Sequence, residues 1–513
     1  MKFTSETALV ASTLVLASAG ACHKISLTRK SKQSRKEEET KEATESSATE
    51  EDLLPMAISI GLPAPSSSTV EASVEDIAQV QLVANAVRRR VLEYTLHNNG
   101  GYLSQGCSSA ETLATLYALT MKLGPSVLPL LPGPFHGSPG PQNHARTGEG
   151  HNGDPTDPSL DRLIFSPVHY ALVLYSLLVE LGRLDVKAFE SYNKDGSTVE
   201  LIGAEHSPGH AVTAGSLGQA LSQAAGIAYA RKKKAHSGRV FVFMSDGEFQ
   251  EGQTWEALQG LVFHKIDNLV VLVDVNGQQC DGLMSSVMDM GNLSKKLEAF
   301  GAHVHNVDGH DIAAIDQACQ VHHSHVGRPT FVLCHTDPCR GFEKLRERAP
   351  KLHYVRFKGS EEKAEWEKIL NGMPIQHTKF STQNAPPSKE PKLQSDGPGL
   401  REKRHHRHSS STLPPRIHTH TSNNKVVVRP HRSNLVKWVR AHPEVIVLTA
   451  DLTSSCEADL VRDELPDQFL SFGMTEQHMI SFAGGLAREG FRPFIHTFGV
   501  FLTRRPFDQV AMR

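Results

Sequence analysis

The chain has 513 residues, which at about 150 residues per domain leaves room for two or three domains. Apolar residues make up 39%, a low share that indicates that part of the length does not belong to a core. With 54 Lys and Arg against 56 Asp and Glu, the net charge of −2 gives no whole-chain signal for nucleic acid or an anionic membrane. No apolar run approaches the roughly 18 residues of a spanning helix. The seven cysteines are scattered without a C-x-x-C motif, which argues against a disulfide framework or a zinc site and favours a reducing compartment.

Two segments have a composition that cannot form a core. Residues 1–73 begin with a short apolar stretch, Ala8 to Ala21, and continue as basic and then Glu/Ser/Thr-rich sequence. This composition fits a targeting leader followed by a spacer, and it fits equally a disordered extension without a targeting signal. The sequence therefore leaves both a cytoplasmic and an organellar location open. Residues 371–424 are rich in Pro, Ser, Lys and His, and we interpret them as a disordered, solvated linker rather than a metal or polyanion tract.

Between these segments, helical and strand patterns alternate. Apolar spacing predicts helices over residues 77–92, 172–181 and 217–231. Short continuous apolar runs predict buried strands over residues 239–244, 269–273 and 330–334, and residues 124–158 form a long Pro/Gly-rich loop. This alternation predicts an α/β domain over 74–370 with a doubly wound parallel sheet. From residue 425 a strand (445–448), a helix (477–487) and a strand beginning at 491–494 predict a partial second α/β domain over 425–513.

Polar residues follow two of the predicted strands directly. Ser245-Asp246-Gly247-Glu248 ends the 239–244 strand, and Asp274-Val-Asn276-Gly277 ends the 269–273 strand. The carboxyl ends of parallel strands meet at one edge of the sheet, where open α/β sheets bind ligands. Oxygen donors of low total charge suit Mg²⁺ or Ca²⁺ shared with a phosphate.

At this point the sequence resembles the transketolase family of thiamine-diphosphate enzymes. That family carries Gly-Asp-Gly and an Asn about thirty residues later, matched here by Ser245-Asp246-Gly247 and Asn276, and its flanks are matched by residues 213–219, 246–252 and 307–311. The resemblance implies that Asp246, Asn276 and the carbonyl of Gln278 hold the metal. It also implies further cofactor contacts at Gly215, Leu217, Gly247 and Glu248.

Several histidines fall in positions of the family's motifs. His169, in Ser166-Pro-Val-His169, and His353, in Leu352-His353-Tyr354, are expected to contact cofactor diphosphate or substrate. Either His206 or His210 matches a further active-site histidine, and we favour His206. Two departures stand out, because the family's early histidine is Tyr102 and a family glutamate is Ala211.

A second cluster lies near residue 476. Ser471-Phe-Gly-Met-Thr-Glu476-Gln resembles the pyrimidine-binding motif of the family, which implies that Glu476 is the catalytic acid that hydrogen-bonds the aminopyrimidine ring of the cofactor. Phe498 and Phe501 match the aromatic pair that packs against this ring. Asp451 matches an aspartate near the family's dimer interface.

The resemblance therefore implies a transferase that moves a two-carbon ketol unit between sugar phosphates with thiamine diphosphate and Mg²⁺. A deoxyxylulose-phosphate-synthase type of enzyme and a truncated, catalytically weak paralogue with a binding or regulatory role are the alternatives. The match stops inside the pyrimidine-binding domain, so we expect a fragment, a degenerate paralogue, or a chain that works as a homodimer or with a second chain. No nucleic-acid partner is expected.

Overall fold

The computed structural model describes residues 72–125, 129–133, 148–320, 326–376 and 430–511, all within one compact unit, Ser68–Arg513. The sequence regions interpreted as a leader extension and a linker lie almost wholly outside the described residues. Of the described helices, none is both long and apolar enough to cross a membrane.

The main sheet has five parallel strands in the order β1-β2-β3-β7-β6. Its strands are β1 (Arg162–Phe165), β2 (Val240–Ser245), β3 (Leu269–Val275), β7 (Thr330–His335) and β6 (His303–Asp308). The central residues of β1, β2, β3 and β7 are buried apolar side chains, as parallel strands covered on both faces require, whereas the edge strand β6 is partly exposed. The predicted α/β fold with a parallel sheet is confirmed.

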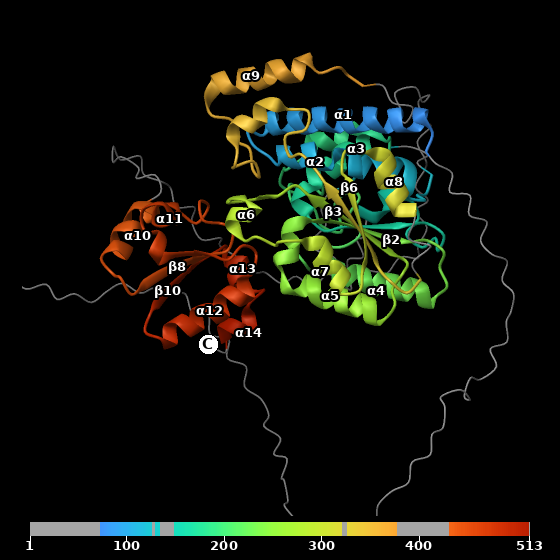
Figure 1. Cartoon of the computed structure of the whole chain (residues 1–513). Helices are drawn as coiled ribbons and strands as arrows, with labels where there is room; N and C mark the ends of the chain where they lie inside the picture. The colour runs from blue at the N-terminus through green and yellow to red at the C-terminus, as the bar shows by residue number, and fades with distance from the viewer. Residues whose placement is uncertain (1–71, 126–128, 134–147, 321–325, 377–429, 512–513) are drawn as a thin grey trace, which may run out of the picture. The chain divides into compact units, whose positions relative to one another are not determined.

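Helices cover both faces of this sheet (Figure 1). Alternate residues of β2 point to opposite faces, so Phe241 and Phe243 join one apolar core and Val240 and Val242 join the other. The first core contains α1 (Val74–His97), α2 (Leu103–Thr115), α3 (Ala171–Glu180) and α8 (Ile312–Gln320). The second contains α4 (Ala220–Lys233), α5 (Gly252–Phe263) and α7 (Leu293–Ala299).

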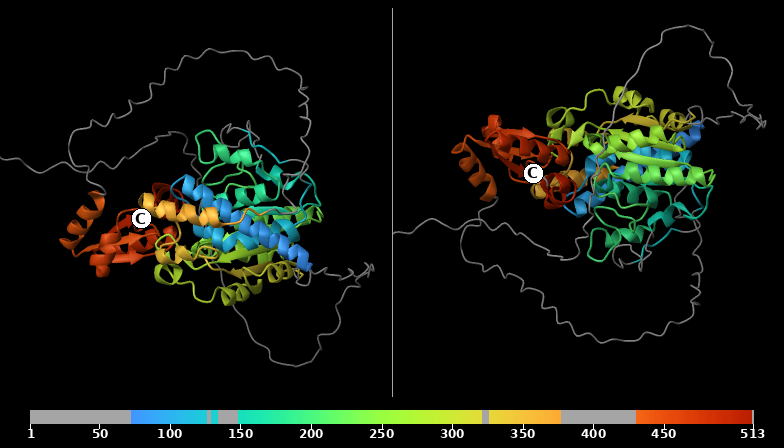
Figure 2. Two further views of the ribbon diagram at one scale, coloured as in Figure 1. Left: turned by 90° about the horizontal axis from the view of Figure 1, so that it is seen from above. Right: turned by 90° about the horizontal axis from the view of Figure 1, so that it is seen from below.

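Two helix boundaries show how local chemistry sets the elements. The side chain of Ser73 accepts the Asp76 N–H at 3.1 Å and caps the start of α1. Helix α4 begins at Ala220 rather than at the predicted Leu217, because Gly218 has a φ of +81° and cannot belong to a right-handed helix. At the other end of the domain, α9 (Gly359–Gly372) lies along α1 and buries Trp366 (Figure 2).

Shorter elements complete the first region. They are the hairpin strands β4 (Gln278–Gln279) and β5 (Gly282–Leu283), the helix α6 (Met284–Val287), the π-helix η1 (Leu116–Thr120), and the 3₁₀ helices η2 (Gly148–Asn152), η3 (Val168–Tyr170), η4 (Val186–Ser191), η5 (Asp246–Gln250) and η7 (Glu343–Arg348).

The C-terminal region is a smaller α/β layer. Three parallel strands lie in the order β10-β8-β9, namely β10 (Arg492–His496), β8 (Val445–Thr449) and β9 (Phe469–Ser471). Helices α10 (Pro430–Arg440) and α11 (Asp459–Glu464) pack on one face, and α12 (Glu476–Arg488) packs on the other. The elements η9 (Pro466–Gln468), α13 (Gly499–Thr503) and α14 (Phe507–Ala511) complete it. The predicted strands and helix of this region are confirmed, with α12 starting at Glu476 itself.

Candidate functional site

The carboxylate of Asp246 lies at the carboxyl edge of the main sheet, directly after β2. It accepts the backbone N–H groups of Gly247 and Gly277, each at 2.8 Å, so it joins the loop after β2 to the loop after β3. Burial, opposed by the Gly277 N–H and assisted by the charge of Asp274, raises the pKa of Asp246 to about 7. A buried carboxylate of this kind is stabilised in its ionised form by a bound cation.

The side chain of Asn276 is held by Asp274, near the end of the preceding strand β3. Its Nδ2 donates to Asp274 Oδ2 at 2.8 Å and to the Tyr170 hydroxyl at 3.1 Å, and its Oδ1 accepts the Gln278 N–H at 2.9 Å. The fully buried carboxylate of Asp274 also accepts hydroxyl donors from three other elements: Ser108 at 2.7 Å, Tyr170 at 3.0 Å and Thr336 at 2.6 Å. Asp274 therefore fixes the orientation of the Asn276 amide.

A hard cation fits this donor set. The side-chain Oε1 atom of Gln278 is buried and has no hydrogen-bond partner among the described residues, so an unsatisfied oxygen lies next to the predicted ligands Asn276 and the carbonyl of Gln278. The described ranges contain no group of three or more His, Cys, Asp or Glu side chains that could hold a metal. A cation here would therefore depend on amide and carbonyl oxygens beside the single carboxylate of Asp246, a set typical of Mg²⁺ or Ca²⁺.

Glu248 ties three loops of the site together. Its buried carboxylate accepts the Ser166 hydroxyl, the Gly218 N–H at 3.1 Å and the Ser245 N–H at 2.9 Å. Both of its oxygens thus accept hydrogen bonds from within the chain, and its contact with a cofactor stays a prediction. The turn before α4 offers approach to its backbone, because Gly215 is exposed and a Cβ there would meet nothing within 4 Å, while Leu217 is half-buried.

The structure brings His169 and His353 together. Their ring centroids are 5.2 Å apart, and the ring of Tyr102 lies 5.1 Å from the first and 5.5 Å from the second. Burial lowers the pKa of His353 to about 4, and burial together with His353 holds the pKa of His169 well below its usual value. Both rings are therefore neutral near pH 7, and each has an unprotonated ring nitrogen that can accept a hydrogen bond. The Nδ1 of His353 contacts Gln105 Nε2 at 3.3 Å, which orients the ring.

The other two histidines have partners elsewhere. His206 Nε2 lies 2.8 Å from Glu200 Oε2. The buried ring of His210 packs edge-on against Phe165, with its Nδ1 3.1 Å from the Pro208 carbonyl oxygen. Neither arrangement tests the predicted active-site role of His206.

In the C-terminal region, Glu476 opens α12 and is 2% exposed. Arg505 Nη1 donates to both of its oxygens, at 2.9 Å and 3.0 Å, and also to Glu251 Oε1 at 2.6 Å. The guanidinium, on a side chain only 6% exposed, lies over the ring of Phe501 at 4.5 Å. Burial, opposed by Arg505 and assisted by Glu476, raises the pKa of Glu251 to about 8. One cation therefore serves two buried carboxyl groups.

Two further predicted positions have defined surroundings. Phe498 and Phe501 stack on one another with ring centroids 6.1 Å apart, and Phe498 is 45% exposed. Asp451, at a φ of +52°, accepts the N–H groups of Cys280 at 3.0 Å and Asp281 at 2.9 Å. Its role at a subunit interface stays a prediction.

Comparison with known proteins decides the family. Residues 147–369 match the family model of the transketolase thiamine diphosphate binding domain, and residues 431–513 match that of the transketolase pyrimidine binding domain. A putative uncharacterized transketolase family protein of Sinorhizobium fredii is 33% identical over 283 residues, which cover 54% of this chain and 90% of that protein. The chain belongs to the transketolase family.

Full-length members of the transketolase family extend beyond the matched region. Human transketolase is 28% identical over 440 residues, covering 84% of this chain and 62% of that protein, and human transketolase-like protein 2 is 30% identical over 446 residues, covering 85% and 64%. The chain thus spans less than two thirds of the length of these two relatives. Among solved structures, a transketolase from Campylobacter jejuni is 18% identical with a TM-score of 0.45, covering 86% of this chain and 68% of that one.

Three residues of this transketolase-family site escaped the sequence analysis as functional groups. Asp274 carried a signal, since it lies near the end of a predicted strand and precedes Asn276 by two positions, a spacing that places side chains of extended backbone on one face. Glu251 and Arg505 carried none, because their contact joins positions 254 residues apart.

Proposed function

We propose that this chain is a transketolase-type transferase that moves a two-carbon ketol unit between sugar phosphates, with thiamine diphosphate and Mg²⁺ as cofactors. The observation that carries the proposal is the buried Asp246 carboxylate, which the Gly277 N–H ties to the half-buried loop of Asn276 at the carboxyl edge of the sheet, within the match to a thiamine diphosphate binding domain. Loops at this edge are where open α/β sheets take up cofactors.

In this proposal Asp246, Asn276 and Gln278 hold the Mg²⁺ that neutralises the diphosphate, and the turn at Gly215 approaches it with backbone N–H groups. When bound, thiamine diphosphate supplies a thiazolium ring that accepts the electron pair of the broken carbon–carbon bond. Asp274 keeps the Asn276 amide turned so that its oxygen, rather than its nitrogen, remains available to the cation, as the hydrogen bond from Asn276 Nδ2 to Asp274 supports.

Glu476 is the proton-handling residue of the proposal. Its place at the first turn of an apolar helix keeps the carboxyl group fixed, and Arg505 holds both of its oxygens. The rings of His169 and His353, which their low pKa values keep neutral, accept hydrogen bonds from substrate hydroxyl groups and orient the substrate. Phe498 and Phe501 offer the apolar surface for a planar ring.

The proposal extends to the assembly. As the family resemblance implies, the working form would be a homodimer or a pair with a second chain. Sedimentation of the purified chain at several concentrations, alone and with cofactors, measures this directly.

The test of the function is calorimetry of the full chain with thiamine diphosphate plus Mg²⁺, followed by an assay with a ketose phosphate donor. Glu476→Ala should keep cofactor binding but abolish proton exchange at the reactive carbon of the thiazolium ring, whereas Asp246→Asn should lose cofactor binding. Absence of binding to the unaltered chain would contradict the proposal. Turnover with pyruvate but not with a ketose donor would favour the synthase type, and binding without turnover would favour a binding or regulatory protein.

A further inference from the structure

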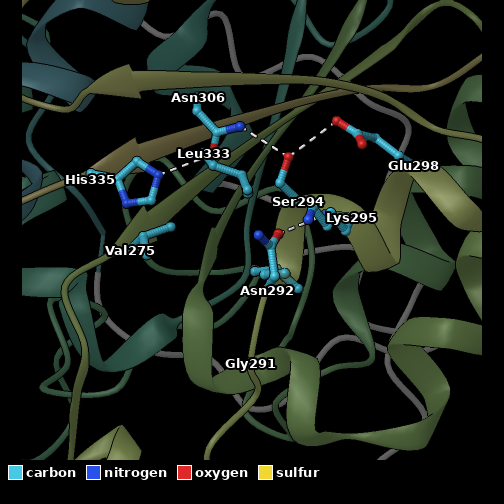
Figure 3. A pocket seen from close by; sticks show the side chains of 10 residues that line it. Val275, Gly291, Asn292, Ser294, Lys295, Glu298, Asn306, Leu333 and His335 are labelled. Atoms are coloured by element: carbon cyan, nitrogen blue, oxygen red, sulfur yellow. Dashed lines mark hydrogen bonds between the residues drawn. The ribbon is translucent and has the colours of Figure 1, made fainter.

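A cavity opens at the same carboxyl edge of the main sheet, beside β3, β6 and β7. Its volume is about 500 Å³, and its walls come from the ends of those strands and from the start of α7 (Figure 3). Val275 and Leu333 give it apolar surface, while its polar side chains come from α7, β6 and β7. None of the predicted cofactor or catalytic residues lines it.

A row of hydrogen bonds crosses one wall of this cavity. His335 Nε2 lies 3.0 Å from Asn306 Oδ1, Asn306 Nδ2 donates to Ser294 Oγ at 2.9 Å, and Ser294 Oγ donates to Glu298 Oε1 at 3.2 Å. Figure 3 shows these groups side by side, with Asn306 between His335 and Ser294. The row therefore presents fixed donors and acceptors at hydrogen-bonding distance from one another, which is the kind of surface that recognises hydroxyl groups.

The charge of the cavity is asymmetric. The ammonium group of Lys295 forms no ion pair within the described ranges. The backbone N–H of Lys295 donates to Asn292 Oδ1 at 2.9 Å, which caps the start of α7. The carboxylate of Glu298, on the next turn of α7, already accepts the Ser294 hydroxyl. One cation without a partner suits a ligand with a single anionic group, and the nearby carboxylate disfavours a ligand with several phosphates.

We propose that this cavity is a second small-molecule site that binds an anionic polyol, such as a sugar monophosphate, separately from the Asp246–Asn276 site. Its volume lies within the range of about 300–1,000 Å³ that is usual for small-ligand pockets. Lys295 takes the anionic group, the His335–Asn306–Ser294 row takes the hydroxyl groups, and the apolar surface of Val275 and Leu333 takes the carbon chain.

The cavity also shares backbone with the cofactor site. The carbonyl oxygen of Val275 accepts the Thr336 N–H at 3.1 Å, and the Thr336 hydroxyl donates to Asp274 Oδ1 at 2.6 Å. A ligand that contacts Val275 and His335 would therefore also restrict the motion of the adjoining segment that carries Asn276. This restriction should increase the affinity for the cofactor. That effect rests on the proposed function, whereas the binding of the polyol to the cavity does not.

The binding is tested on the full chain without cofactor, with ribose 5-phosphate as the probe and calorimetry as the readout. Lys295→Met should weaken binding about 10-fold, because it removes one charge-assisted hydrogen bond. Lys296→Met is the matched control, since it removes the same charge from the next residue of α7, which does not line the cavity. Asn306→Leu, at an exposed strand position, should weaken binding as well, because it breaks the row.

Hydrogen exchange locates the site independently of affinity. On addition of ribose 5-phosphate, the backbone of residues 291–298 and 303–308 should gain protection in the unaltered chain and in Lys296→Met. Unphosphorylated ribose should not bind. If gluconate binds as tightly as ribose 5-phosphate, the proposal of an anionic polyol ligand still holds, and the anionic group of the ligand is then a carboxylate. The proposal is overturned if the unaltered chain does not bind the probe at millimolar concentration, if ribose binds equally well, or if Lys295→Met and Lys296→Met behave alike.

Discussion

The buried carboxylate of Asp246 predicts an unusual dependence of stability on pH. Its pKa is about 7 in the folded chain against an ordinary value of 3.8, so between these values the folded chain binds one proton more than the unfolded chain. The free energy of unfolding therefore falls as pH rises, and the shift of roughly 3 units corresponds to about 4 kcal/mol in total, reached above pH 7. Asp246→Asn removes this titration. The difference in unfolding free energy between the variant and the unaltered chain should consequently grow by about 4 kcal/mol in favour of the variant from about pH 4 to about pH 8.

Urea unfolding of both proteins, followed by intrinsic fluorescence without divalent cations, measures this difference. Asp451 and Glu251, with pKa values raised to about 7 and about 8, titrate in both proteins, so their contributions cancel. Addition of Mg²⁺ with thiamine diphosphate should flatten the pH dependence of the unaltered chain, because the cation stabilises the ionised carboxylate, and should leave Asp246→Asn unchanged. Parallel pH profiles for the two proteins without cation would refute the reasoning.

Three further changes test other parts of the site. Arg505→Leu leaves two buried carboxyl groups without their cation and should lower the free energy of unfolding by about 3–5 kcal/mol, while the exposed Arg504→Leu should change it little; equal effects in urea unfolding would show that the cation is not needed. Asp274→Asn should lower the affinity for Mg²⁺ about 10–100-fold in a cofactor-dependent melting assay, and an unchanged affinity would remove its positioning role. Tyr102→His restores the residue of the family motif and should raise kcat/KM with a ketose donor about 10-fold or more; a turnover that does not rise would place this ring off the path of the substrate.

Much of the fold followed from local patterns in the sequence. The strands that became β2, β3 and β7 are short, continuous apolar runs bounded by polar residues, and the structure places them side by side and parallel. Because each run ends in polar residues, the meeting of Asp246 with the loop after Asn276 at one sheet edge was also predictable. The proximity of His169 and His353 followed only from the motif resemblance, since 184 positions separate them and no spacing rule links them.

The parts that escaped prediction depend on tertiary contacts. Periodicity does not reveal that Arg505 pairs with Glu251 and Glu476, because salt bridges between distant segments leave no local pattern. The late start of α4 depends on one backbone angle at Gly218, which apolar spacing over residues 217–231 does not register. The edge strand β6 is half polar, with exposed Asn306 and Asp308, so it lacks the continuous apolar run by which the central strands were found.

The carboxylate of Glu248 has a consequence for how this protein can vary. It accepts hydrogen bonds from the loop of Ser166, the turn of Gly218 and the loop of Ser245, so one side chain holds three segments of the chain together. Substitutions that move any of these three loops should not have additive effects, since the loops share hydrogen bonds to one carboxylate. The segments carrying His169, the glycine turn and Asp246 are therefore coupled as one mutational unit. Related chains should exchange them together as matched sets, and a chimera that mixes them should be less stable than either parent.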